Sequence, residues 1–561
     1  MSEKTKNILF KIIIFLGLAI LISIPYINAK AIFGHDISYH LNRIVSIKEE
    51  LELGNFPVLM HSNLNEGFGY ANPLFYPEIF LYIPAIICMI GANCFVAYKV
   101  FIFLINLATI LITYYSANII FKNRKIVWIT TLLYTVAFYR LSDIYIRGAI
   151  GEVLALTFLP LVLSGLYEII FGDNKKWWIV CFGIFGVINS HVLTFFMAII
   201  LIIIICLFNV VRIFKEKRFK NLIIAGIVSL LLSLSFALPY LEQATKNKYN
   251  VNEYTNIVIQ DTGESLKEML NISFSSKDAY KSVGLIIIIG ALTSLFSNKK
   301  ENQNYYIKQL LFLGIILLIC SSNKMPWNKL CAKIHAISTI QFVYRLNIIT
   351  TVLLTFCAGY GIYNLFENKK KLLVFIVGVV IILQYSLMIF TLDINEPNYS
   401  AEEAFYLSPT GNSEYLPLGT KFKDKTVRNI NSETPIKFTR IGSKIEFLYE
   451  DSENPMVIHI PLVYYKGYKS YIESEDGTKT ELFISQDEYS KNIHLNSDEI
   501  ITGKVTIEYK MTIIQKFSYI VTYTVLILLI IYICVSREDF IFKGFKQKKL
   551  DIPNKIKNSE M

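Results

Sequence analysis

The segment GHDISYHLNRI, residues 34–44, places an aspartate, two histidines and an arginine directly after the first long apolar run of the chain. A carboxylate such as Asp36 can take a proton from a hydroxyl group, as a general base does. Arginine side chains match the oxygens of a phosphate with two parallel donors. His35, His40 and Arg43 therefore accompany a candidate base in a segment suited to a phosphorylated substrate.

Other polar residues stand at the ends of apolar runs further along the chain. They are Arg140, Asp143, Arg147, Glu152, His191, Gln341 and Arg345. Ionisable side chains at membrane depth are costly and usually face a cavity or a charged partner. Because the loop charges place all of them on one side, we expect a single polar cavity that opens outward. In it Asp36 is the predicted base, and Arg147 and Arg345 are the predicted phosphate ligands.

The remaining candidates would bind substrate, shape the site or neutralise its charge. They are His35, His40, Arg43, Glu152, His191 and Gln341. His40 and Arg43 share one helical face with Asp36, because they follow it at helical spacing.

Each candidate also has a simpler explanation. Asp36 alternatively caps the helix that begins near Ile37. A structural ion pair is the default for Arg147 and Glu152. His191 fits a satisfied histidine at a helix end, and Arg345 fits a side chain that reaches lipid phosphates. The aromatic run 68–77 alternatively forms a belt at the membrane interface. The prediction therefore rests on the joint placement of these residues.

The composition indicates a polytopic membrane protein. The chain has 561 residues, of which 53% are hydrophobic, and its mean hydropathy is +0.45. A soluble globular chain is less apolar. The net charge of +11 lies largely in short lysine-rich loops, which indicates membrane orientation rather than nucleic-acid binding. The eight cysteines include no CxxC pattern, so neither a disulfide framework nor a zinc site is predicted.

The pattern of apolar runs predicts about twelve membrane spans. They fall at 8–27, 97–120, 126–140, 152–171, 177–190, 192–212, 221–240, 282–297, 307–321, 341–365, 371–391 and 517–535. The run 74–91 is short and contains Pro77, Glu78 and Pro84. We therefore place it as a juxtamembrane or re-entrant helix on the outer face.

The positive-inside rule decides the orientation. If the run 74–91 does not cross, most lysine-rich loops fall on one side, which is then the cytoplasmic side with both termini. Only the loop 322–339, with three lysines, argues for the opposite orientation. The loop 28–96, the loop 241–281 and the region 392–515 are then extracytoplasmic.

The chain divides into a helical part and a strand-rich part. Residues 1–391 form the predicted transmembrane domain, and the loop 28–96 carries juxtamembrane helices. The region 392–515 alternates in strand fashion, as in KIEFLYE at 444–450, and predicts a β-sandwich. Residues 516–535 form the last predicted span, and 536–561 form a basic cytoplasmic tail.

Several short motifs, in order along the chain, resemble a known group of bacterial membrane proteins. They are HDISYHLNR at 35–43, GNFP at 54–57, GFGYANPLFYP at 67–77, RGAIGEVLAL at 147–156, NSH at 189–191, IQFVYRL at 340–346, EYLP at 414–417 and PLVYYKGYK at 461–469. The sequence is similar to the YfhO-like proteins and to the membrane proteins labelled as related to 6-pyruvoyl-tetrahydropterin synthase. Many relatives read Pro-Trp where this chain has Val343 and Tyr344.

The resemblance implies the GT-C glycosyltransferase superfamily. Such enzymes use sugars linked to a lipid phosphate, usually invert the anomeric centre, and carry an acidic base just after the first span. Asp36 matches that position. Some GT-C enzymes have a second acidic residue there, whereas this chain has His35. No cofactor is therefore predicted with certainty, and a divalent metal stays open.

Three functions are compatible with these observations. The first is transfer of a sugar from a polyprenyl-phosphate donor to a cell-envelope glycan or lipid on the outer face of the plasma membrane. The second is a transporter or flippase for a lipid-linked glycan. Transporters, however, place polar groups near the bilayer midplane, and no inverted halves are visible. The third is a scaffold that binds glycan without catalysis. We expect membrane lipids as partners and no nucleic acid.

Overall fold

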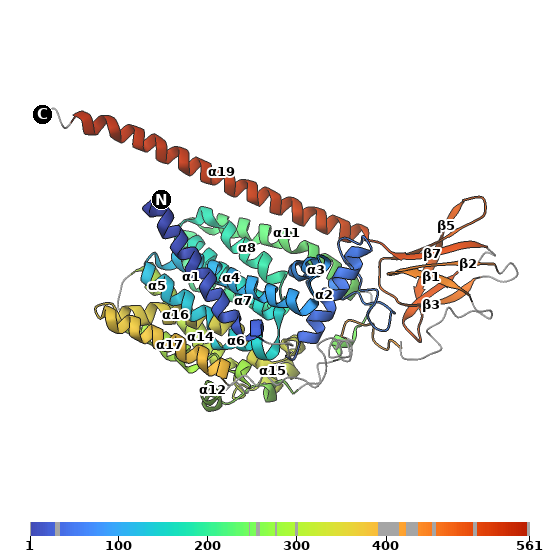
Figure 1. Cartoon of the computed structure of the whole chain (residues 1–561), viewed down its shortest axis with the longest axis horizontal. Coiled ribbons are helices and arrows are strands. Elements are labelled where there is room, and N and C mark those ends of the chain that lie inside the picture. The colour runs from blue at the N-terminus through green and yellow to red at the C-terminus, as the bar shows by residue number, and fades with distance from the viewer. Residues whose placement is uncertain are drawn as a thin grey trace.

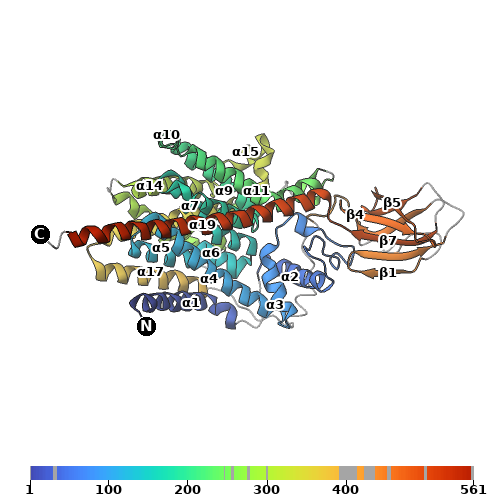
Figure 2. The ribbon, with the colours of Figure 1, turned by 90° about the horizontal axis from the view of Figure 1, so that it is seen from above.

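The computed structural model describes residues 2–28, 34–245, 247–253, 258–274, 278–297, 301–390, 414–421, 436–450, 456–497 and 502–557. These residues form a helical part and a separate antiparallel sheet, which lie at opposite ends of the molecule (Figure 1). Both chain termini lie at the end that is remote from the sheet (Figure 1, Figure 2).

Eight helices in the described ranges are long and apolar enough to cross a membrane. They are α1 (Glu3–Asn28), α4 (Cys94–Phe121), α7 (Ile150–Ile170), α11 (Phe219–Ala244), the segment Ala279–Phe296 with α13 (Leu285–Leu292), α14 (Asn302–Cys320), α16 (Asn347–Phe366) with its preceding turn, and the first half of α19 (Ile513–Lys557). These helices identify an α-helical membrane protein, as the composition predicts.

The other four predicted spans correspond to three shorter helices and one helix of 21 residues. The shorter ones are α5 (Arg124–Thr135), α8 (Trp178–Ile188) and α9 (Val192–Phe208), and the longer one is α17 (Lys370–Phe390). The helices α5 and α8 have 12 and 11 residues, which is about 16–18 Å of helix. A hydrocarbon core is about 30 Å thick. The number of twelve spans therefore stays a prediction.

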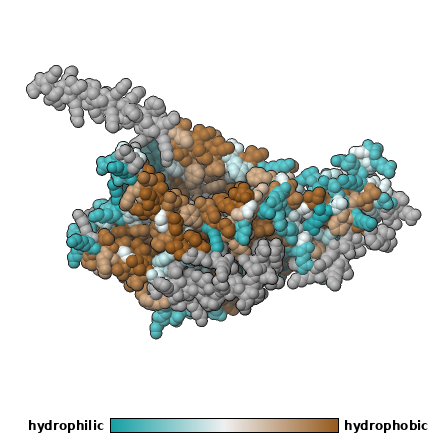
Figure 3. All heavy atoms as spheres, viewed as in Figure 1, coloured by the Kyte–Doolittle hydropathy of each residue, from teal (hydrophilic) through white to brown (hydrophobic). Residues whose placement is uncertain are grey.

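The helices α7 and α16 form the interior of the helical part. Their apolar windows are 89% and 94% buried, whereas those of α1 and α19 are 33% and 17% buried. The outer helices expose many large apolar side chains, for example Phe10, Ile200, Leu230 and Ile520. Apolar surface covers much of the helical part, and the sheet is more hydrophilic (Figure 3). A lipid environment would cover such a surface.

The segment after α1 contains only short helices. They are α2 (Ile37–Glu52), η1 (Asn72–Leu74), η2 (Ile79–Leu81) and α3 (Tyr82–Met89). The apolar stretch Ile79–Met89 is too short to cross a membrane, because its 11 residues extend only about 16 Å. This length agrees with a juxtamembrane or re-entrant helix, and its position on the outer face stays a proposal.

Two glycines bring this segment against the first turn of α7. A Cβ at Gly148, whose φ is +64°, would meet Ile37 Cγ1 at 2.1 Å. A Cβ at Gly151 would meet the Tyr76 hydroxyl at 2.1 Å. Because neither glycine has a side chain, the start of α2 and the residues near Tyr76 approach the backbone beside Glu152.

The C-terminal strands form one antiparallel sheet in the described residues, with the order β1-β2-β7-β4-β5-β6-β3. The strands are β1 (Phe438–Ile441), β2 (Lys444–Tyr449), β3 (Val457–Val463), β4 (Tyr468–Glu473), β5 (Lys479–Gln486), β6 (Asn492–Asn496) and β7 (Gly503–Tyr509).

The strand β5 belongs to both halves of this sheet, since its first half pairs with β4 and its second half with β6. Buried side chains of both halves belong to one hydrophobic cluster. The sequence predicts a β-sandwich, and the structure shows seven antiparallel strands in two halves that are joined through β5 and share one hydrophobic cluster.

The aromatic run 68–77 is not an interface belt, which corrects one of the alternatives above. Phe68, Tyr70 and Phe75 are only 3%, 2% and 3% exposed. They belong to the same hydrophobic cluster as the sheet residues Ile445 and Ile507. Burial against the sheet domain, rather than contact with lipid headgroups, therefore accounts for this run, and it joins the first loop to the C-terminal domain.

Candidate active site

Asp36 immediately precedes α2, but its carboxylate makes no capping hydrogen bond to that helix. The backbone N–H of Asp36 donates to the Arg147 carbonyl over 2.8 Å. The carboxylate Oδ2 lies 3.9 Å from Nη2 of Arg147, and 44% of the Asp36 side-chain surface is exposed. The structure therefore disfavours the helix-cap alternative and leaves an accessible carboxylate beside a cation.

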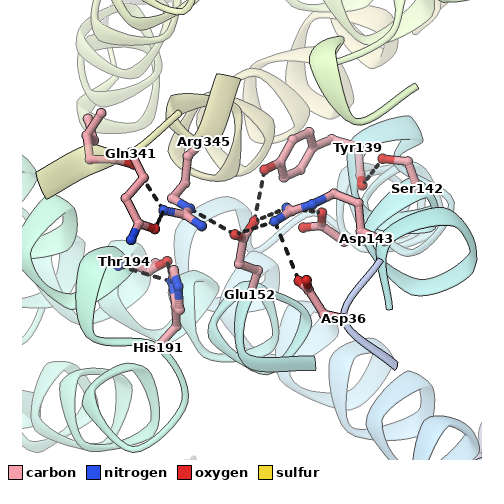
Figure 4. Close-up of polar contacts among 11 residues, drawn as sticks. Asp36, Tyr139, Ser142, Asp143, Glu152, His191, Thr194, Gln341 and Arg345 are labelled. Atoms are coloured by element: carbon pink, nitrogen blue, oxygen red, sulfur yellow. Dashed lines mark hydrogen bonds and ion pairs between the residues drawn. The ribbon is translucent and has the colours of Figure 1, made fainter. Parts of the chain in front are cut away.

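Glu152, on the first turn of α7, is the centre of a buried charge cluster. Nη1 and Nη2 of Arg147 donate to its two carboxylate oxygens over 2.6 and 3.0 Å. Nε of Arg345 donates to Oε1 over 3.0 Å, and the Tyr139 hydroxyl donates to Oε2 over 3.0 Å. Figure 4 shows Glu152 between Arg345 and Asp36. Glu152 thus holds both predicted phosphate ligands in place, so the ion-pair alternative for Arg147 and Glu152 is correct.

Asp143 adds a second carboxylate to Arg147. Its Oδ1 accepts from Nη1 of Arg147 over 2.8 Å, and its buried Oδ2 has no hydrogen-bond partner among the described residues. Burial raises the pKa of Asp143 well above its ordinary value, repulsion from Glu152 adds to this, and Arg147 opposes it. Arg147 is therefore occupied mainly by protein carboxylates.

Arg345 differs from Arg147 in its terminal nitrogens, because both Nη1 and Nη2 of Arg147 donate to carboxylates. Nη1 donates to the Ile340 carbonyl over 3.0 Å and to Oε1 of Gln341 over 2.8 Å. Among the described residues, none accepts a hydrogen bond from Nη2. Gln341 has a φ of +63°, a backbone conformation that is rare for a residue with a side chain. Gln341 thus orients Arg345, which is the better placed of the two predicted phosphate ligands.

His191 caps α9 and faces the charge cluster (Figure 4). Its Nδ1 lies 2.7 Å from the Thr194 hydroxyl and accepts from the Thr194 N–H over 3.4 Å. Burial lowers the pKa of His191 to about 3, with Glu152 opposing and Arg345 and Arg147 contributing. The neutral ring therefore carries its proton on Nε2, which can donate a hydrogen bond. His191 is a satisfied histidine at a helix end, as the simpler alternative states, and also lines the site.

His40 and Arg43 lie in a second buried cluster, away from Glu152. Nε of Arg43 donates to Oε1 of Glu78 over 2.8 Å, and Nη2 donates to the Pro77 carbonyl over 2.7 Å. Nη1 lies 3.2 Å from Nδ1 of His40. Protein groups thus occupy the Arg43 fork. The predicted contact of His40 and Arg43 with substrate stays a prediction.

The cluster of Arg43 and Glu78 holds Tyr76 next to the cluster around Glu152. The Arg43 guanidinium lies over the Tyr76 ring at 4.5 Å, and the Tyr76 ring centroid is 6.1 Å from that of His191. Burial disfavours the charged form of Glu78, but His61 and Arg43 lower its pKa to about 2. The ionised Glu78 therefore anchors Arg43, and through it the aromatic wall of the site.

His35 lies at the edge of the site. Its side chain is exposed, and its ring contacts the ring of Tyr280 edge-on at 5.4 Å. Tyr280 in turn lies 5.9 Å from the Arg147 guanidinium. His35 is therefore an exposed residue beside Tyr280 and next to Asp36 in the chain.

The environment of Asp36 alters its acidity. Burial raises the pKa of Asp36 above its ordinary value; Arg147 opposes this by attracting the ionised form, and Glu152 adds repulsion. A carboxylate with a raised pKa is a stronger base than an exposed one, provided that it stays ionised. The site thus combines an accessible carboxylate, a partly engaged arginine and a neutral histidine.

Several residues of the site cannot be assigned from the sequence. Tyr139, Tyr76 and Glu78 sit in apolar or aromatic runs, and no spacing pattern marks them. The sequence marks these three residues only as polar side chains in short segments between helices, on the same predicted side of the membrane as the other candidates. In the described part of the chain, no group of three or more His, Cys, Asp or Glu side chains is arranged to hold a metal ion.

The fold and the site define a helical membrane protein with a charged polar centre where the first loop meets the helical part. The chain belongs to the family described as "Family of unknown function (DUF6541)", whose model matches residues 10–388. The match covers the helical part with all candidate residues up to Arg345. It does not confirm the finer resemblance to the YfhO-like proteins. No curated protein matches the sequence significantly.

Solved structures of membrane glycosyltransferases are similar to this chain over part of their length. The mycobacterial arabinofuranosyltransferase AftD is 12% identical with a TM-score of 0.43, covering 70% of this chain and 28% of that chain. A point mutant of AftD is 13% identical with a TM-score of 0.46, covering 72% and 30%. The Archaeoglobus fulgidus oligosaccharyltransferase is 14% identical with a TM-score of 0.44, covering 72% and 58%. The chain thus spans less than two thirds of these proteins, and its activity is to be inferred from its own site.

Proposed function

We propose that this protein is a membrane glycosyltransferase that moves a sugar from a polyprenyl-phosphate donor to a cell-envelope glycan or lipid acceptor. One observation carries the proposal: the Asp36 carboxylate is accessible, makes no capping bond, and lies beside the buried cluster of Arg147, Glu152 and Arg345. A structural cap would bond to its helix, whereas a catalytic base needs a carboxylate that substrate can reach.

The reaction uses Asp36 as the base. Its carboxylate takes the proton of an acceptor hydroxyl while that oxygen bonds to the anomeric carbon of the sugar. The bond between this carbon and the donor phosphate oxygen breaks, and the phosphate leaves with the electron pair. Attack on the face opposite the leaving group inverts the anomeric centre. The step balances without a cofactor.

Arg345 stabilises the charge that develops on the leaving phosphate. Its Nη2 is the donor that no described residue engages, and its other nitrogens are held by Glu152, Ile340 and Gln341. Preorganised donors of this kind favour the transition state because they do not reorient during the reaction. Nε2 of His191 is a second donor on the same side, and the neutral ring adds no charge.

The predicted orientation places this site outside the cytoplasm. In support, both termini lie at the end of the molecule remote from the sheet (Figure 1), and the lysine-rich loops are predicted on the side of the termini. The first loop and the C-terminal domain pack together, so they share one side. The polyprenyl tail would lie in the bilayer along the apolar outer helices.

Orientation is testable with Asn123→Cys, in the lysine-rich loop between α4 and α5, in a variant without the native cysteines. We expect no labelling of intact cells by a membrane-impermeant maleimide and full labelling after permeabilisation, since this loop is predicted to be cytoplasmic. The matched control is Glu253→Cys in the 241–281 loop, which should react from outside. Labelling of position 123 in intact cells would invert the orientation.

A second prediction concerns pH. A general base works when ionised, so kcat/KM should rise with pH through the pKa of Asp36 and fall as the pH drops below it. Because burial raises that pKa, the acidic limb should lie above the value of about 3.9 for an aspartate in water. Measuring kcat/KM from about pH 4 to pH 8 would show this limb. A flat profile down to the acid end of that range would contradict the assignment.

The proposed function is tested with purified protein in nanodiscs, supplied with a panel of undecaprenyl-phosphate hexoses and pentoses and cell-envelope acceptors. We expect acceptor-dependent release of undecaprenyl phosphate from at least one donor. If no donor in the panel releases lipid phosphate, the transferase proposal is wrong and a transporter or scaffold is the better description.

A further inference from the structure

The loop that precedes Arg345 has an unusual charge composition. It connects two candidate membrane spans, Asn302–Cys320 and Val343–Phe366, and Arg345 stands in the first turn of the second one. The loop itself, residues 321–342, contains three lysines and no Asp or Glu. A loop that joins the ends of two spans lies at the level of the lipid headgroups. Its side chains therefore meet the bilayer surface as well as the protein.

The helix α15 (Trp327–Lys333) in this loop uses one of its faces for packing. Trp327 is buried and forms a hydrophobic cluster with Val343 and Leu346, which stand on either side of Arg345. The helix lies at the periphery of the helical part (Figure 1, Figure 2). The packed face of α15 therefore fixes the loop beside the turn that carries Arg345.

The opposite face of α15 is exposed and basic. Lys329 and Lys333 are four residues apart and share one face of the helix, and both are exposed. Lys324 is exposed before the helix, and Ile334, directly after it, is 55% exposed. Basic residues beside an exposed apolar side chain are typical of a segment that lies in the membrane interface. We call Lys324, Lys329, Lys333 and Ile334 the loop surface.

The protein does not neutralise the three ammonium groups of the loop surface. Among the described residues, none forms an ion pair or accepts a hydrogen bond from them. The segment η7 (Ile259–Thr262), which packs against α15, and the residues after it contribute two acidic side chains, Asp261 and Glu264. Glu264 is already paired with Lys281 over 2.8 Å. The loop surface thus keeps a net positive charge, which a negatively charged headgroup complements.

We propose that the loop surface docks on anionic phospholipids of the bilayer. The ammonium groups contact the negatively charged headgroups, and Ile334 enters the boundary of the acyl chains. Through the cluster of Trp327 and Val343, the docked lipid holds the turn of Arg345 at the level of the headgroups. The inference does not rest on the proposed function, because its ligand is the bilayer and not a substrate.

The proposal also accounts for an exception to the predicted orientation. The loop 322–339 is the lysine-rich loop that opposes the charge bias of the others. Lysines that bind lipid headgroups are retained for that contact, so they need not mark the cytoplasmic side.

The test uses the full chain without native cysteines, labelled with bimane at Ala332→Cys, an exposed position on α15. The protein is reconstituted in phosphatidylcholine vesicles with a small fraction of nitroxide-labelled phosphatidylglycerol or nitroxide-labelled phosphatidylcholine, and quenching of bimane measures the association of each lipid. We expect an association constant at least about fivefold larger for the anionic lipid, since one lysine near an anionic surface already contributes about this factor.

The combined variant Lys324→Gln, Lys329→Gln and Lys333→Gln should reduce this preference to less than about twofold, because it removes the charge of the loop surface. Its thermal midpoint should equal that of the wild type, since all three lysines are exposed.

The matched control removes three exposed lysines of the sheet, each of which is paired with a glutamate. It combines Lys469→Gln, Lys479→Gln and Lys504→Gln. This variant has the same net charge as the loop variant and should keep the wild-type preference.

The proposal is overturned if both lipids quench the wild type equally, if the loop variant keeps the preference, or if the control loses it. It is also overturned if inorganic phosphate abolishes the preference at an ionic strength at which chloride does not, because the loop would then bind free anions. The readout is lipid association and not turnover, so a protein that transfers no sugar can still confirm the docking, and an active enzyme without lipid preference refutes it.

Discussion

Asp36→Asn is expected to lower the rate of sugar transfer by at least about 100-fold, because an asparagine amide cannot take the proton of the acceptor hydroxyl. The fold should be unchanged, since the Asp36 carboxylate makes no capping hydrogen bond to α2 and its contact to Arg147 is 3.9 Å. Single-turnover transfer of a radiolabelled sugar from a polyprenyl-phosphate donor measures this rate.

The matched control is Glu52→Gln at the opposite end of α2. Glu52 forms a half-exposed pair with Lys48 over 3.2 Å, and such surface pairs contribute little. Its rate of transfer should equal that of the wild type. An Asp36→Asn protein that keeps more than about a tenth of the wild-type rate would show that another group is the base.

Glu152→Ala is expected to destabilise the helical part by about 3–5 kcal/mol. The carboxylate of Glu152 is the shared partner of Arg147, Arg345 and Tyr139, and it is only 3% exposed. Without it, Arg345 loses its carboxylate partner and Arg147 keeps mainly Asp143. Buried charges without partners are strongly unfavourable. The thermal midpoint of the detergent-solubilised protein, followed by fluorescence-detected size exclusion, measures the loss.

A comparison with Glu216→Ala separates this effect from the general cost of removing a glutamate. Glu216 pairs with Arg212 and Arg218 on a partly exposed surface, where ion pairs are worth about 0–1 kcal/mol. The combined replacement of Arg147, Glu152 and Arg345 by methionine should recover part of the stability, because it leaves no buried charge. Equal midpoints for Glu152→Ala and Glu216→Ala would contradict the central role of Glu152.

Local sequence patterns were sufficient to predict the long helices and the strand-rich character of the last third. An apolar run of about twenty residues, as in α1 or α16, is long enough to cross a membrane as an α-helix, in which all backbone hydrogen bonds are made within the segment. Alternation of polar and apolar residues, as in the first half of 444–450, predicts strands. Whether β5 joins two sheets into one is decided by pairing between strands that are distant in sequence, and no local pattern carries that information. The same is true of α8, whose apolar run appears longer than the helix because it ends in a turn at Asn189.

The loop charges predict one side of the membrane for Asp36, Arg147 and Arg345, and the structure brings these three residues together around Glu152. The sequence does not show which of the arginines donate their hydrogen bonds to carboxylates of the protein itself. Arg43 donates to Glu78, a residue 35 positions later. Arg147 donates to Asp143 and Glu152. These pairings depend on how the first loop packs through Gly148 and Gly151, which is a tertiary effect.

The most direct test of the central claim is acceptor-dependent transfer of a radiolabelled sugar from undecaprenyl phosphate, measured side by side for the wild type and Asp36→Asn in nanodiscs. We predict transfer by the wild type with equimolar release of undecaprenyl phosphate, and neither product from Asp36→Asn. Equal transfer by both proteins, or the absence of transfer by the wild type with every donor of the panel, would contradict the assignment of Asp36 as the base of a membrane glycosyltransferase.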